Sequence, residues 1–130
     1  MIVLDASAVI DWLLQTPEGK RIEERIYAHN ESLHAPHLVD LEVAQVLRRL
    51  VRDGTIPVLR AEKAICDLRD LRMTRYPHSV FLSQIWQRRN NMSAYDASYV
   101  VLAEKLGATL LTRDRGLASV SGPGVSVELM

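Results

Sequence analysis

Short apolar runs alternate along the chain with longer segments in which apolar residues recur at helical spacing. The β-branched run at residues 2–4 predicts a buried strand that ends at Asp5. Ser7 then offers an N-cap for a helix that carries Val9 and Leu13 on one face. The N-terminal segment therefore predicts a strand followed by a helix.

The same alternation continues along the rest of the chain. Further helices are predicted at residues 20–30, 39–53, 57–73, around 80–86 and 93–106. Further strands are predicted at residues 33–35, 109–112 and 125–129. Strands separated by helices imply an α/β fold, in which a short, mostly parallel sheet of about four to five strands is flanked by helices. No linker or repeat interrupts the pattern, so residues 1–130 are predicted to form a single domain.

Two acidic residues lie just beyond predicted strands. Asp5 follows the first strand, and Asp114 comes shortly after the strand that ends at Thr112. Ligands of parallel α/β sheets bind at the carboxyl ends of the strands. Both acids are therefore candidates for a functional site.

A third candidate, Asp96, comes from helical phase. Asp96 lies on the same helical face as Tyr99 and Val100, which directs its carboxylate toward the core side. The pattern Ser93-x-x-Asp96 also matches a helix cap, in which an acid of the first turn interacts favourably with the helix dipole. Both interpretations stay open, and they are compatible with each other.

Helical phase does not identify a fourth acid. Asp40 and Glu42 both lie at the start of the helix predicted at 39–53, and their side chains point roughly 200° apart, so at most one can share a given site. Asp40 lies closer to the apolar side if the helix already includes it, and it is accounted for as an N-cap if the helix starts after it. The spacing leaves the choice open.

The composition is that of a globular protein with its own core. The chain has 130 residues, 48% of them hydrophobic, and 16 basic residues balance 16 acidic ones. A chain of this size buries about two thirds of its unfolded surface and needs no disulfide or structural metal to fold. Cys66 is the only cysteine, which excludes an internal disulfide and a cysteine-based zinc cluster. With no basic leader and no apolar run of membrane-spanning length, we expect a soluble cytoplasmic protein with no membrane partner.

The basic residues are unevenly distributed. Thirteen of the 16 are arginine, and the stretch from Arg48 to Arg89 has ten basic and four acidic residues, so it carries +6 and the remainder −6. These arginines are either the solvent-facing sides of helices or a rim that binds phosphate. The candidates for phosphate contacts are Arg48, Arg49 and Arg52.

The sequence lacks the motifs of a serine hydrolase, a Walker-type nucleotide-binding protein and a histidine-dependent ribonuclease. Ser7 is not part of a Gly-x-Ser-x-Gly elbow, and no glycine-rich Walker loop is present. No histidine is spaced with an acid as an acid–base pair, so we expect the histidines to be ordinary surface or capping residues. They are His29, His34, His37 and His78. The aromatic residues at apolar phases are expected in the core. They are Trp12, Trp86 and Tyr99.

Several segments together carry a family resemblance. They are VLDASAVIDWLL near the N-terminus, the run Glu-Val-Ala-Gln-Val-Leu from Glu42, the block AYDASYVVLAEKLGATLLT from Ala94 to Thr112, and Thr112-Arg113-Asp114. In order and spacing they resemble PIN-domain ribonucleases, and most closely the VapC toxins of bacterial and archaeal toxin–antitoxin pairs. The likeness spans the whole chain.

The resemblance implies a site. It assigns the metal-binding and catalytic acids to Asp5, Glu42, Asp96 and Asp114, and it therefore favours Glu42 over Asp40. It places Ser7 and Thr112 as polar residues beside these acids. Arg115 and Gly116 stand where many relatives have a further acid or amide, a departure that concerns how a second metal would be held.

The resemblance also implies an activity and partners. It implies a Mg²⁺-dependent endoribonuclease, with Mn²⁺ as a substitute, that leaves a 5′-phosphate and a 3′-hydroxyl. It further implies a homodimer and a VapB-type antitoxin that covers the acidic site with a basic side chain. On this interpretation Arg48, Arg49 and Arg52 contact either the RNA substrate or the antitoxin.

A cluster of acids requires a counter-charge whatever the family. Four carboxylates at ~5 Å would repel one another by on the order of 10 to 20 kcal/mol at an effective dielectric near 20, which matches the whole stability of a domain. Protonation or an arginine could neutralise them, but a set of oxygen ligands suits Mg²⁺ or Mn²⁺, which also bind phosphate. The sequence thus predicts a metal-dependent phosphodiesterase.

The alternative is a non-catalytic regulatory module, either receiver-like or PIN-like. A receiver domain has a similar length and acids at strand ends, but it needs an acidic pair after the first strand, where Ala6 and Ser7 follow Asp5. It also needs a lysine after the last strand, which this sequence lacks.

Overall fold

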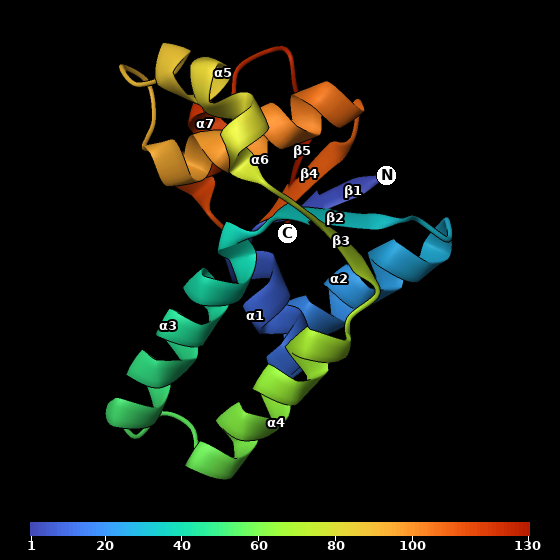
Figure 1. Ribbon diagram of the computed structural model, residues 1–130. Helices are drawn as coiled ribbons and strands as arrows, with labels where there is room; N and C mark the ends of the chain where they lie inside the picture. Colours follow the sequence, from blue (N-terminus) through green and yellow to red (C-terminus); the bar gives the residue numbers. More distant parts are fainter.

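The computed structural model describes all 130 residues, which form a five-stranded sheet with helices on both faces (Figure 1). The strands are β1 (Ile2–Leu4), β2 (Leu33–Pro36), β3 (Met73–Tyr76), β4 (Thr109–Thr112) and β5 (Val127–Leu129). The helices are α1 (Ala6–Leu14), α2 (Pro17–Ala28), α3 (Leu38–Arg52), α4 (Val58–Asp70), the 3₁₀ turn η1 (His78–Phe81), α5 (Leu82–Gln87), α6 (Ala94–Leu106) and α7 (Arg115–Val120). The predicted α/β class is confirmed.

The order of the strands places two chain segments side by side at the centre. The order is β3-β2-β1-β4-β5, and every neighbouring pair is parallel. The chain builds β1, β2 and β3 toward one edge and then returns to add β4 and β5 toward the other. β1 and β4 therefore flank the switch point where ligands of such sheets bind, and Leu4 lies opposite Leu111 there. A receiver domain has the order 2-1-3-4-5, so this topology is not that of the receiver-like alternative.

The two central strands are buried on both faces. All of β1, and Leu110 and Leu111 of β4, are fully covered, as expected for parallel strands between helical layers. Figure 1 shows α5, α6 and α7 on one side of the sheet, and α1 and α2 on the other. This burial fixes the positions of the residues that follow the strands.

α3 and α4 form a hairpin that extends away from the sheet (Figure 1). Gly54 at the turn has φ +74°, a left-handed conformation that glycine adopts without strain. Cys66 of α4 is exposed and free. None of the helices combines the length and the apolar composition required to cross a bilayer.

Two helix starts differ from the prediction. Asp5, not Ser7, caps α1, since its Oδ1 accepts a hydrogen bond from the Ala8 N–H at 3.0 Å. α2 begins at Pro17 rather than at residue 20, because Thr16 caps it and proline fits the first turn of a helix.

The region after α4 departs most from the prediction. The helix predicted at 57–73 ends at Asp70, and the unpredicted edge strand β3 begins three residues later at Met73. The helix expected around 80–86 is the turn η1 followed by α5, and α7 was not predicted.

Two side chains lie where the prediction did not put them. Trp86 was expected in the core but is 67% exposed, because the six-residue α5 buries only Ile85. His34 was expected at the surface but is buried, with hydrogen bonds to the hydroxyls of Tyr76 and Ser32.

Candidate active site

Asp5 lies at the carboxyl end of β1 and is 5% exposed. The Ser7 hydroxyl and the Ala8 N–H donate to Oδ1 at 2.7 and 3.0 Å, and the Thr112 hydroxyl donates to Oδ2 at 2.5 Å. A carboxylate offers about four acceptor positions, so these bonds orient Asp5 and leave about one position open. Burial raises the pKa of Asp5, against the lowering effect of the Thr112 and Ser7 hydroxyls, and the negative charge of Asp114 adds to the rise.

Thr112 is fully buried at the end of β4 and connects two of the acids. Its hydroxyl donates to Asp5 and accepts a hydrogen bond from the Asp114 N–H at 2.9 Å. The Ser7 hydroxyl oxygen accepts a further bond from the Arg113 N–H at 3.0 Å. Ser7 and Thr112 therefore hold the ends of β1 and β4 together, in addition to the backbone pairing.

Glu42, and not Asp40, faces the other acids. The Tyr99 hydroxyl donates to Oε1 of Glu42 at 2.5 Å. Burial raises the pKa of Glu42, and the charges of Asp5 and Asp96 raise it further, against the hydrogen bond from Tyr99. Asp40 instead forms a salt bridge at 2.8 Å with Arg75 of β3.

Tyr99 has a role at the site that the sequence did not reveal. It was predicted to be a core residue and it is buried, but its hydroxyl also holds Glu42. Burial and the bond to Glu42 raise the pKa of Tyr99, so its hydroxyl stays protonated and donates. The sequence feature that could have indicated this role is the position of Tyr99 one helical turn after Asp96, on the same face of the helix.

The remaining two acids, Asp96 and Asp114, lie at the N-termini of helices. Asp96 lies half-buried in the first turn of α6, where the Ser93 hydroxyl oxygen accepts the Asp96 N–H at 3.1 Å. Burial raises the pKa of Asp96, and the charge of Asp114 adds to this effect. Asp114 is exposed and caps α7, since its Oδ1 accepts the N–H groups of Gly116 and Leu117 at 2.8 and 3.2 Å.

The four acids lack a counter-charge within the chain. None of them has a basic partner within salt-bridge distance, although Asp11 pairs with Arg113 and Asp40 with Arg75. Asp114 raises the pKa of Asp5 and of Asp96, and Asp5 and Asp96 raise the pKa of Glu42, but no three acidic, histidine or cysteine side chains lie at the spacing of ligands to one metal ion. Their donor chemistry, carboxylate oxygens alone, fits a hard divalent cation that would draw them together.

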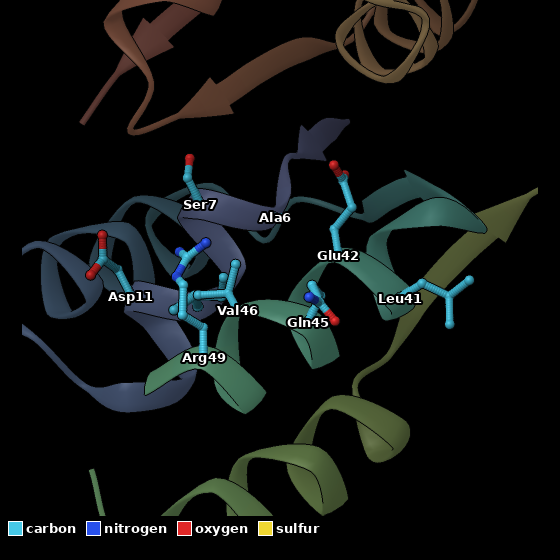
Figure 2. A pocket seen from close by; sticks show the side chains of 9 residues that line it. Ala6, Ser7, Asp11, Leu41, Glu42, Gln45, Val46 and Arg49 are labelled. Carbon is cyan, nitrogen blue, oxygen red and sulfur yellow. The ribbon is translucent and has the colours of Figure 1, made fainter. Parts of the chain in front are cut away.

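An open groove of about 550 Å³ extends from Glu42 between α1 and α3 (Figure 2). Figure 2 shows Ser7 and Glu42 pointing to the same side from these two helices. Gln45 and Arg49 also line the groove, because they follow Glu42 by three and seven positions and share its helical face. The groove therefore joins the acids to one basic side chain two turns away.

The other two candidate arginines lie elsewhere. Arg48 lines a separate hollow between α3 and α4. Arg52 is exposed at the end of α3, 3.9 Å from Asp53. The structure thus separates three arginines that the sequence grouped.

Known proteins are similar to this chain along nearly its whole length. Residues 2–123 match the PIN domain. The VapC ribonuclease Mb0985 of Mycobacterium bovis is 44% identical over 118 residues, which cover 91% of this chain and 89% of that protein. Ribonuclease VapC12 of Mycobacterium tuberculosis is 35% identical over 130 residues, which cover 100% of this chain and 99% of that protein.

A solved structure supports the fold. The crystal structure of PAE2754 from Pyrobaculum aerophilum superposes with a TM-score of 0.71 at 24% identity, and the match covers 97% of this chain and 82% of that one. Together with the near full-length sequence matches, these comparisons decide the family. The chain belongs to the PIN-domain family and, within it, to the VapC proteins.

Proposed function

We propose that the protein is a divalent-metal-dependent endoribonuclease and the toxin of a type II toxin–antitoxin pair. The observation that carries this proposal is the set of four acids at the switch point of the sheet, which share no basic partner. Relatives that are named VapC ribonucleases support RNA as the substrate.

Asp5, Glu42, Asp96 and Asp114 would hold Mg²⁺, which Mn²⁺ can replace. When bound, the ion supplies a water of lowered pKa and stabilises negative charge on the reacting phosphate and leaving oxygen. The chain itself orients the ligands. Thr112 and Ser7 fix Asp5, Tyr99 fixes Glu42, and the first turn of α6 holds Asp96.

The purified protein is expected to cleave RNA in the presence of Mg²⁺ or Mn²⁺ and to produce fragments with 5′-phosphate ends. EDTA is expected to abolish the cleavage. Because an ion that binds only the folded state stabilises it, we also expect either cation to raise the melting temperature. Full cleavage in EDTA, or products that end in a 2′,3′-cyclic phosphate, would contradict the proposal.

Replacement of Tyr99 by phenylalanine is expected to lower the rate of RNA cleavage by about 10- to 100-fold, which is typical when a group that orients a metal ligand is lost. The ring remains to fill the core, but Oε1 of Glu42 loses its donor. Metal titration of the cleavage rate measures the effect, and the variant should require more Mg²⁺. An unchanged metal requirement would assign Tyr99 to the core alone.

Replacement of Arg49 by alanine is expected to weaken RNA binding and to reduce the salt slope by roughly 0.7 to 1, the contribution of one phosphate contact. Arg49 lies in the groove that contains Glu42. Arg48→Ala is the matched control, because Arg48 lines the other side of α3. Binding is measured without divalent cations to prevent hydrolysis, and equal slopes for the two variants would show that the groove does not carry the RNA.

We further propose a VapB-type antitoxin, a homodimer and a cytoplasmic site of action, where the RNA substrate is found. An antitoxin segment with a basic side chain would supply the charge that the four acids lack. Sedimentation of the purified protein tests the dimer. Inhibition of cleavage by the product of an adjacent small gene tests the antitoxin.

A further inference from the structure

A small apolar cavity lies between η1, α5, α6 and the start of α3. Its volume is about 170 Å³, and its lining includes Leu38, His78, Leu82, Ile85, Tyr95 and Ser98. Sites for drug-sized ligands measure roughly 300–1,000 Å³, so this cavity has room for little more than one planar ring system. The lining is mainly hydrophobic, with His78 as a group that can donate or accept a hydrogen bond.

The cavity shares two helices with the acidic site. Tyr95 directly precedes Asp96 in the first turn of α6. Leu38 lies one helical turn before Glu42, on the same face of α3. Residues that line the cavity therefore lie within one helical turn of Glu42 and of Asp96, close to where a polymer held at the acids would place its neighbouring unit.

The aromatic residue that lines the cavity, Tyr95, is largely exposed to solvent and does not pack into the core. Tyr95 is 62% exposed and Leu82 is 56% exposed, whereas Ile85 behind them is buried. Trp86, which lies on α5 with Leu82 and Ile85, is also exposed. The guanidinium of Arg89 lies 4.8 Å from the centre of the Trp86 ring. The segment from α5 to the start of α6 thus presents exposed aromatic rings and a cation, the combination that binds bases and phosphates of single-stranded nucleic acids.

We propose that this cavity binds an unpaired nucleobase of the RNA next to the phosphodiester that is cut, and that Tyr95 stacks on the base and so contributes to sequence selection. This inference rests on the proposed nuclease function. The ligand is one nucleobase, recognised by stacking on Tyr95 and by a hydrogen bond to His78. The same contacts position the strand across the four acids.

The first test compares cleavage of RNA oligonucleotides that differ only in the nucleotides beside the mapped cut. We expect Tyr95→Ala to lower kcat/KM for the preferred RNA by about 5- to 150-fold, the range of one stacked base, and to reduce the differences in kcat/KM between RNAs that carry different bases there. Tyr95→Phe keeps the ring and should retain both. Tyr27→Ala is the matched control, because Tyr27 is similarly exposed on the distant helix α2.

The second test does not depend on cleavage. The four nucleoside monophosphates are titrated into the isotopically labelled Glu42→Gln variant, and saturable NMR shifts are expected at the amides of Leu82, Tyr95 and Ser98. Tyr95→Ala should abolish these shifts. If the wild-type protein does not cleave RNA, the nuclease proposal fails, and this titration alone decides whether the cavity binds a base.

Absence of saturable shifts in this titration would overturn the inference, and so would three further results. The first is a Tyr95→Ala variant with wild-type selectivity. The second is an equal effect from Tyr27→Ala. The third is a Tyr95→Ala variant whose sedimentation changes from dimer to monomer, since the face would then be covered by a second copy of the chain. If the wild-type protein cleaves RNA and one of these outcomes is observed, the nuclease proposal is retained and only the proposed base-binding site is rejected.

Discussion

Replacement of Glu42 by glutamine should lower RNA cleavage by at least about 1,000-fold, because a metal ligand contributes several kcal/mol to stabilisation of the transition state and each 1.36 kcal/mol is tenfold in rate. The amide keeps the shape of the side chain and an oxygen that can accept the Tyr99 hydroxyl. The fold should therefore survive. Burial and the neighbouring acids raise the pKa of Glu42, so removal of its charge should leave the melting temperature unchanged or higher.

Asp40→Asn is the control for this prediction. Asp40 lies two residues earlier on α3 and points to a different side, where it pairs with Arg75. Its neutralisation removes one partly exposed salt bridge, which contributes about 1 kcal/mol or less. Single-turnover cleavage of both variants, with circular dichroism to check folding, measures the contrast. If Asp40→Asn loses as much activity as Glu42→Gln, the active acid on α3 has been misassigned.

Replacement of Gly19 by alanine should destabilise the protein, although alanine is the better helix former by about 1 kcal/mol. A Cβ atom at this position would lie 1.8 Å from the carbonyl oxygen of Asp11 and 2.4 Å from its carbonyl carbon. These are backbone atoms of α1, so α2 must move away from α1 as a unit. Overpacking of this kind costs roughly 1–3 kcal/mol and occasionally more.

Because the contacts are this short, we expect a cost at the upper end of this range, which after the gain in helix propensity leaves a net loss of about 2 kcal/mol and a melting temperature lower by about 8 °C, at roughly 4 °C per kcal/mol for a chain of this length. Lys20→Ala in the same helix is the control, since Lys20 is exposed and its replacement should change stability by no more than about 0.5 kcal/mol. Thermal unfolding of both variants measures the difference. A Gly19→Ala variant that melts at or above the wild-type temperature would show that the two helices are not in close contact.

The central part of the fold could be predicted because its residues follow simple patterns. β4 was predicted with its observed bounds, since its apolar run is enclosed by Gly107 and by polar residues. β3 was missed because it is an edge strand in which only Met73 is buried, so no alternation of apolar and polar residues marks it. β3 also follows α4 so closely that Met73, the buried residue of the strand, was counted as the last apolar position of the predicted helix.

The missed strand explains why helical phase alone could not choose between Asp40 and Glu42, a choice that only the family resemblance made. Asp40 is engaged by Arg75, and Arg75 reaches it only because β3 pairs with β2 at the start of α3. A contact between residues 35 positions apart depends on the assembled sheet and leaves no local trace in the sequence. Asp5 and Asp114 were easier to find, because each lies just beyond a strand whose position the apolar pattern already indicated.

The single thiol on the α3–α4 hairpin makes the wild-type chain suitable for fluorescence work. Cys66 is exposed and lies beside the hollow lined by Arg48, on a helix that extends away from the acids. A maleimide dye would therefore attach at one defined position without any substitution. Its emission would report whether another macromolecule covers the hairpin, independently of any measurement of catalysis.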